Sequence, residues 1–216
     1  MENDELLKII RERRSIRKYK STPVPDELLM KILEAGRWAP SSENAQPWRF
    51  IVVKESETRK ALGRIAGGGS SRRFTAEFYS KKIFERFKTL EDEEKRKRVI
   101  EKLTSGRVSA FLAEAPVVIV VCGKLDTWTP LHDCSAAIQN MLLMAKAIGL
   151  GSCWVAAPVA DIRDEMELKE HLGVPDGWKI VSAVAVGYAD EDPKPRPRYP
   201  LEETVFNEVW ARNLRS

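Results

Sequence analysis

The chain has 216 residues, of which 43% are hydrophobic and 31% charged, a balance typical of a folded globular protein. Its 36 basic and 32 acidic residues give a net charge of +4, too small an excess to indicate nucleic-acid binding by itself. No apolar run approaches the roughly 18 residues that span a bilayer, and the charged start MENDELLKIIRERR lacks the apolar core of a signal peptide. We therefore expect a cytoplasmic protein with no membrane segment.

The first half of the chain predicts three helices around one strand. Amphipathic helices are expected at 4–14 and 26–38, a buried strand at 49–53, and a further helix from 56 to about 66. The stretch GGGSSRR, 67–73, predicts a flexible break. Beyond it, 74–103 is helical but highly charged, which fits either a lid over a site or a solvated helix pair without a role.

The second half predicts three strands and a central helix. Strands are expected at 116–122, within GLGSCWVAAP and at 178–188, with helices at 131–148 and 161–172. Four prolines make 190–200 extended, and an amphipathic tail, 201–214, follows it. The order predicts one α+β domain over 1–216, with helices on both faces of a small sheet. Within it, 67–107 is expected to form a lid-like excursion and 190–216 a C-terminal arm.

Conventional catalytic motifs are missing from the sequence. It contains no phosphate-binding P-loop, no dinucleotide-binding glycine fingerprint and no nucleophile elbow. His132 and His171 have no obvious partner, and Asp133 is expected to have a satisfied role in the central helix. The three cysteines sit in apolar stretches and predict core packing rather than a disulfide or zinc site. We expect no catalytic side chain and no metal, so a bound cofactor would supply any reactivity.

Two basic segments predict a phosphate site. RRSIRKY, 13–19, places three arginines around a hydroxyl, and PKPRPR, 193–198, alternates basic residues with prolines that restrict the chain. Guanidinium groups match phosphate oxygens in bidentate geometry. Spacing alone does not show whether the two segments meet.

The loop APSSENAQPW, 39–48, is a second unusual feature. Two prolines, two hydroxyls, two amides and an indole are more than a tight turn needs. The loop either simply stops the preceding helix or offers small donors and acceptors to a ligand.

Four blocks together resemble the nitroreductase family of flavin enzymes. They are RRSIRKY, PVPDELLMKILEAGRWAPSSENAQPWRFIVV, AAIQNMLLMAKAIGLGSCWVAAP, and VAVGY with PKPRPRYPLEE. The resemblance implies a three-layer α/β/α fold with a small, mixed, mainly antiparallel sheet and an arm that reaches a dimer partner. It also implies a homodimer that binds FMN at the subunit interface and takes electrons from NADPH or NADH.

The resemblance assigns flavin contacts residue by residue. Arg13 and Ser15 match positions that hold the phosphate and ribityl chain, with Arg14 beside them, and Arg17 matches a cation near the pyrimidine edge of the ring. The remaining matches are Arg196 and Arg198 at the phosphate, Pro40, Ser41, Ser42 and Asn44 from the other subunit, and the backbone of Trp154, Val155, Ala156 and Ala157 near flavin N5. Gln46 and Trp48 are expected to brace the loop.

The implied activity is reduction of nitroaromatics, quinones or activated enones by ping-pong hydride transfer. Ala156 departs from the family, which often has an acidic residue there. A specialised member therefore stays open as an alternative: a dehalogenase, a desaturase or an enzyme that consumes the flavin. A more remote alternative is a non-catalytic module that binds a phosphate ligand or nucleic acid.

Overall fold

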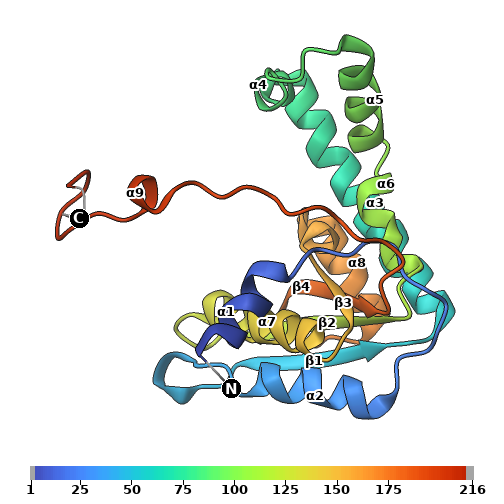
Figure 1. Ribbon diagram of the computed structural model, residues 1–216. Coiled ribbons are helices and arrows are strands. Elements are labelled where there is room, and N and C mark those ends of the chain that lie inside the picture. Colours follow the sequence, from blue (N-terminus) through green and yellow to red (C-terminus); the bar gives the residue numbers. More distant parts are fainter. Residues whose placement is uncertain (1–2, 213–216) are drawn as a thin grey trace.

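The computed structural model describes residues 3–212, and within them four strands form one sheet (Figure 1). The strands lie in the order β1-β2-β4-β3, and each pair of neighbours is antiparallel. Their bounds are Trp48–Val53 for β1, Val117–Lys124 for β2, Gly151–Val155 for β3 and Trp178–Gly187 for β4.

The helices agree with the predicted ones to within a few residues, except at 67–73. The longer helices are α1 (Asn3–Glu12), α2 (Asp26–Arg37), α3 (Ser56–Tyr79), α5 (Glu93–Thr104), α7 (Pro130–Ala147) and α8 (Ile162–Leu172). The short ones are η1 (Ser42–Asn44), α4 (Lys82–Arg86), α6 (Arg107–Ala110), η2 (Phe111–Ala113), η3 (Ala157–Val159) and α9 (Leu201–Thr204).

Strand β2 is buried on both faces and serves two separate cores. Ile119 and Val121 pack with residues of α2 and α7, whereas Val118 and Val120 pack with residues of α3 and α8. Successive side chains of a strand point to opposite faces of a sheet, so an unbroken apolar run suits a strand covered on both sides. The result is the predicted three-layer arrangement of helices, sheet and helices.

Helix α7 is apolar nearly all round because other elements enclose it. It contacts α2, α1 and all four strands of the sheet. Ile138 and Met141 are completely buried in this layer. Burying one such side chain stabilises a fold by about 1.5–3 kcal/mol, so α7 anchors this half of the core.

The predicted flexible break at 67–73 is wrong, because these residues lie inside the 24-residue helix α3. The small residues allow α3 to pack closely against its neighbours. A Cβ atom at Gly69 would lie 2.3 Å from the carbonyl oxygen of Ala157, and the Ser70 hydroxyl donates to the Gly67 carbonyl at 3.1 Å and the Gly106 carbonyl at 3.3 Å. Close helix packing therefore outweighs the poor helix propensity of glycine.

The second half of α3 carries the predicted excursion away from the sheet. Figure 1 shows α4 and α5 at the far end of this helix. Phe78, Tyr79 and Phe84 cluster there and are partly or largely exposed. The excursion is thus helical, as expected, and its role as a lid stays a prediction.

The C-terminal arm is extended, as its prolines predict. Residues 191–200 form no helix or strand, and the arm leaves the body before it reaches α9 (Figure 1). Near its end, the rings of Phe206 and Trp210 lie 4.9 Å apart, with Trp210 87% exposed. Of the predicted arm, 213–216 lies outside the described residues, as does 1–2 of the predicted domain. Contact of the arm with a second subunit stays a prediction.

No helix within 3–212 has both the length and the apolar character needed to cross a bilayer. Over the same residues, no group of three His, Cys, Asp or Glu side chains is arranged to hold a metal ion.

Gly69→Ala should lower the free energy of unfolding by about 1–3 kcal/mol, because the new methyl group would collide with backbone rather than with a movable side chain. Gly67→Ala is the matched control. Its Cβ would make only ordinary contacts, 3.5 Å from Cβ of Ala110 and 3.6 Å from the Gly106 carbonyl oxygen, and the better helix propensity of alanine favours this change by up to about 1 kcal/mol. Thermal denaturation of both variants checks the prediction, and equal melting temperatures would contradict it.

The three cysteines should resist alkylation in the folded protein. All three are buried and free, and burial raises the pKa of Cys122 to about 11 and that of Cys134 to about 12. A thiol with a pKa that high is ionised roughly one time in a thousand or less at about pH 8, and the thiolate is the reactive form. Mass spectrometry after iodoacetamide treatment should find labelling only in concentrated urea. Rapid labelling without urea would mean that the core is open.

Candidate functional site

The segment 13–20 crosses the open edge of β3 and then runs beside the start of the arm. The Ile16 N–H donates to the Ser152 carbonyl at 3.0 Å, and the Lys20 N–H donates to the Tyr188 carbonyl at 2.9 Å. These backbone bonds fix the segment to the sheet at two points. The arginines at 13, 14 and 17 are therefore presented by ordered backbone rather than by a free terminus.

Gly151, at the start of β3, makes this close crossing possible. A Cβ atom there would lie 2.9 Å from Cγ1 and 3.0 Å from Cβ of Ile16, which is itself buried. The second glycine of the GLGSCW block thus has a packing role at the β3 edge.

Glu191 ties the arm to the same segment. Its carboxylate accepts hydrogen bonds from the backbone N–H groups of Arg17 and Lys18, and the Asp190 N–H donates to the Lys18 carbonyl at 2.9 Å. These contacts turn the proline-rich stretch back toward the arginines. Sequence reasoning missed Glu191, because nothing in its spacing marks it as different from the other acids nearby.

The two basic segments meet around one cavity of about 210 Å³. The sequence spacing does not show whether the two segments meet, and in the structure they do. The cavity is lined by Arg13, Arg14, Ser15, Arg17, Pro193, Lys194, Arg196 and Arg198. These residues include every cation that the sequence assigned to a phosphate or flavin, with Lys194 in addition.

The six cations around this cavity lack acidic partners. None of them forms an ion pair with a carboxylate in residues 3–212. Some guanidinium groups bond to backbone instead: Arg14 Nη1 donates to the Arg11 carbonyl at 2.6 Å, and Arg198 Nη1 to the Pro197 carbonyl at 3.0 Å. The Glu191 carboxylate next to this cluster binds backbone N–H groups of Arg17 and Lys18 rather than a cationic side chain. The remaining excess of positive charge suits the cavity to a multiply charged anion.

Arg13 is partly buried among these cations. Burial lowers the pKa of its guanidinium below the ordinary value, and the charges of Arg14 and Arg198 lower it further. Both causes disfavour the charged form, and an anion bound in the cavity would offset them.

A neighbouring cavity of about 180 Å³ has a different character. It shares Arg13 and Arg14, but Glu12, Glu191 and Asp192 also line it. The mixed charge makes it a poorer place for a phosphate than the wholly basic cavity.

Two titratable groups close to residues of the basic cavity have raised pKa values and stay uncharged. The Tyr19 hydroxyl donates to the Ile16 carbonyl at 2.5 Å, and burial raises the pKa of Tyr19 well above its usual range. Burial also raises the pKa of Cys153, which is only 2% exposed and lies near Ser15. Neither group competes with a ligand for the cations.

The loop 39–48 is held in a defined shape. The Ser41 hydroxyl accepts from the Gln46 N–H at 3.0 Å, and the Gln46 side-chain amide donates to the carbonyl and side-chain oxygens of Asn44, both at 3.3 Å. Asn44 and Gln46 have positive φ angles of 54° and 46°. The prediction that Gln46 braces the loop is confirmed, while Trp48 is 4% exposed and packs in the core.

Helix α7 anchors the loop through Asp133. One carboxylate oxygen of Asp133 accepts from the Ser42 N–H and the Thr129 hydroxyl, each at 3.2 Å. Its second oxygen is buried and has no partner among the residues described here. The expectation that hydrogen bonds satisfy Asp133 therefore holds for one carboxylate oxygen and not for the other.

The loop residues do not share the basic cavity of their own chain. Pro40, Ser41, Ser42 and Asn44 are absent from its lining, and all are at least partly exposed. The segment 154–157 also lies outside the lining. Trp154 is 38% exposed and Val155 is buried, after which Ala156 and Ala157 lead into η3.

A protein-family model, that of the nitroreductase family, matches residues 10–188. A protein named NADH dehydrogenase from Thermus thermophilus is 32% identical over 201 residues, covering 90% of this chain and 92% of its own. The structure of an FMN-dependent nitroreductase from Clostridium difficile is 27% identical with a TM-score of 0.71, over 94% of this chain and 99% of that one. A nitroreductase with bound FMN from Bacteroides fragilis is 26% identical with a TM-score of 0.65, covering 95% and 99%. The match covers the first basic segment, the 39–48 loop and strands β1 to β4. The chain therefore belongs to the nitroreductase family.

Proposed function

We propose that this protein is an FMN-dependent oxidoreductase that uses NADPH or NADH to reduce small, flat electrophiles such as nitroaromatics, quinones or activated enones. The observation that carries the proposal is the cavity of about 210 Å³ in which six cations have no acidic partner in the described chain. A phosphate ester with two negative charges fits that charge distribution. Membership of the nitroreductase family supports FMN as the ester.

The chain's own residues would hold the phosphate and the ring edge. Arg13 and Ser15, with Arg14 beside them, would bind the phosphate and ribityl chain from one side, and Arg196 and Arg198 would close from the arm. Arg17 is exposed near Ser15, its Nη1 lying 3.4 Å from the Ser15 carbonyl. A cation at the pyrimidine edge favours the negative charge that the flavin gains on reduction.

No side chain is needed as an acid or base. When bound, FMN supplies hydride transfer between the nicotinamide donor and the acceptor. The protein's tasks are to bind and orient the ring and to exclude water. Backbone at Ala156 and Ala157 would face N5, where a donor N–H tunes reduction without a titrating group.

The functional unit is a homodimer with FMN between the subunits. The 39–48 loop lies outside the basic cavity of its own chain, so a second chain would complete the site. Leu6, Leu7 and Ile10 on α1 are each more than 40% exposed, and Trp210 on the arm is 87% exposed. Apolar surface of this kind is typical of a subunit interface.

A specialised member of the family is the second candidate, because Ala156 replaces the acidic residue that is frequent there. Repeated reduction of the bound flavin by NADPH or NADH would exclude an enzyme that consumes FMN. We place the protein in the cytoplasm, since its three cysteines are free in the fold, as expected in a reducing compartment.

Arg13→Ala and Arg196→Ala should each weaken FMN binding by roughly 10- to 100-fold, the value of one charge-assisted hydrogen bond of about 1.5–3 kcal/mol. Lys60→Ala is a charge-matched control, since Lys60 is exposed on α3 and pairs with Glu57 away from the cavity. Titration of flavin-free protein by FMN fluorescence quenching measures the dissociation constants. A double Arg13 and Arg196 variant that keeps its flavin through gel filtration would contradict the phosphate placement.

Mixing two defective variants tests whether the site spans two subunits. One chain carries Arg13→Ala with Arg196→Ala, and the other carries Ser41→Ala with Asn44→Ala. In a mixed dimer, the intact cavity of the second chain combines with the intact loop of the first chain to form one complete site. FMN binding and NADPH oxidation should therefore reappear after mixing. No recovery, with subunit exchange confirmed by mass spectrometry, would mean that each site lies within one chain.

A further inference from the structure

We propose that helix α3 positions the flavin-facing backbone at Ala156 and Ala157, through Gly69 and the ion pair of Arg72 with Asp164. The inference rests on the proposed function, because it assumes that this backbone lies against the flavin. It assigns a positioning task to residues far from the basic cavity in the sequence.

The first support is steric. Gly69 faces η3 so closely that a Cβ atom would lie 2.3 Å from the Ala157 carbonyl oxygen and 2.9 Å from Oδ2 of Asp164. The backbone of α3 at Gly69 thus packs directly against the turn that follows β3. The position of Ala157 depends on the position of α3.

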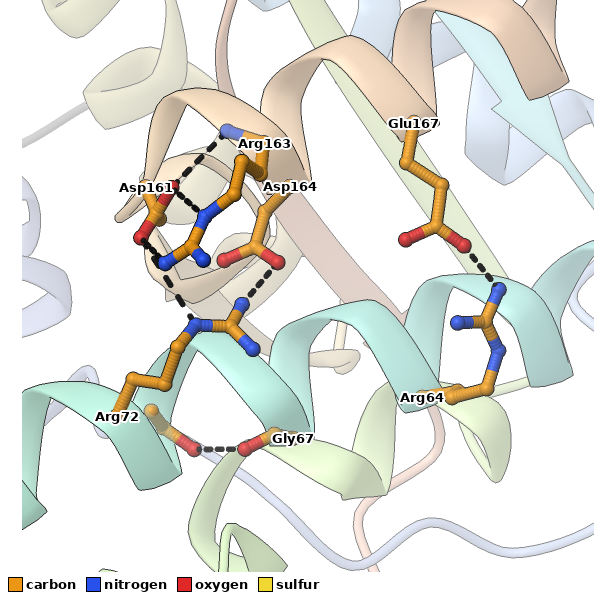
Figure 2. A network of polar contacts seen from close by, with 8 residues as sticks. Arg64, Gly67, Arg72, Asp161, Arg163, Asp164 and Glu167 are labelled. Carbon is orange, nitrogen blue, oxygen red and sulfur yellow. Dashed lines mark hydrogen bonds and ion pairs between the residues drawn. The ribbon is translucent and has the colours of Figure 1, made fainter.

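The second support is a polar network between α3 and the start of α8, which Figure 2 shows. Arg72 Nη2 pairs with Oδ1 of Asp164, and its Nε lies 3.9 Å from Oδ2 of Asp161. Asp161 also binds Arg163 at 2.7 Å and caps α8. Arg72 therefore reaches both acids at the place where the chain leaves η3 and enters α8.

The burial of Asp164 makes its ion pair with Arg72 important for the stability of this region. It is 5% exposed, and its second oxygen is buried without a partner among the described residues. A buried carboxylate depends strongly on its one cation, whereas Arg72 is 45% exposed and has water available. The ion pair between Asp164 and Arg72 therefore ties α3 to the start of α8. This tie keeps α3 at a fixed distance from the neighbouring η3.

The turn between β3 and α8 is held by packing as well as by local bonds, because η3 contacts both α3 and β4 and Pro158 within it is buried. Within it, the Val159 N–H donates to the Ala156 carbonyl at 3.1 Å, and the Ala160 N–H donates to the Ala157 carbonyl at 3.3 Å. These local bonds shape the turn, and its contacts with α3 and β4 fix it to the body. A shift of α3 would therefore move the backbone that faces N5 and change how well it matches the reduced ring.

A second ion pair between the same helices provides an internal control. Arg64 of α3 pairs with Glu167 of α8, two turns from Arg72, and Figure 2 shows both pairs along one face. The Arg64 and Glu167 side chains are 65% and 46% exposed, and the pair lies away from η3. Breaking it removes an α3–α8 ion pair without touching the turn.

The experiment measures the FMN midpoint potential and the FMN dissociation constant for wild type, Arg72→Met, Arg72→Lys, Asp164→Asn and Arg64→Met. Asp164→Asn keeps the side-chain volume and leaves no unpaired buried charge, so it remains informative if Arg72→Met does not fold. We expect Arg72→Met and Asp164→Asn to weaken binding of reduced FMN relative to oxidised FMN by about tenfold, a fall of about 30 mV for a two-electron couple. Arg72→Lys should recover part of the change, and Arg64→Met should match wild type.

Two results would overturn the inference in different ways. Equal potentials in wild type, Arg72→Met and Asp164→Asn, with flavin bound, would show that α3 does not position the ring-facing backbone and would leave the proposed function intact. A wild-type protein that binds no FMN would overturn the proposed function, and the inference with it.

Discussion

The backbone pairing of residues 13–20 with the β3 edge is the constraint on which the candidate site depends. Hydrogen bonds from Ile16 to Ser152 and from Lys20 to Tyr188 fix this segment between the sheet and the start of the arm. Glu191 then binds the same segment through backbone N–H groups. Cations from opposite ends of the chain consequently line one cavity. The repulsion among them is tolerated because ordered backbone, rather than the side chains themselves, determines where they lie.

Much of the fold follows from local patterns in the sequence. The apolar run of β2 and the all-round apolar surface of α7 predict a covered sheet, and the structure has one. The error at 67–73 has a physical cause. Three successive glycines usually favour a break, but here α3 needs small residues to lie against Ala157 and α6, and such tertiary contacts have no signature in a single sequence.

The sequence predicted which kinds of residue form the candidate site, but not the contacts that bring them together. Residue types alone predict a phosphate site at the two basic segments, and the resemblance to the nitroreductase family adds the amide-rich loop as a predicted flavin contact. What brings the basic segments together is backbone pairing and the carboxylate of Glu191, which resembles every other exposed acid in the sequence. The same holds for Asp164, whose burial beside Gly69 appears only in three dimensions. Contacts between residues distant in sequence are the part that spacing cannot supply.

We propose, above all, that this chain is a flavoprotein whose reactivity comes from FMN rather than from a side chain. The most direct test is the visible spectrum of the purified protein, followed by anaerobic addition of NADPH and, separately, NADH. We expect absorbance in the flavin region that one or both donors bleach and that an added quinone restores. A colourless protein that does not take up added FMN would contradict it.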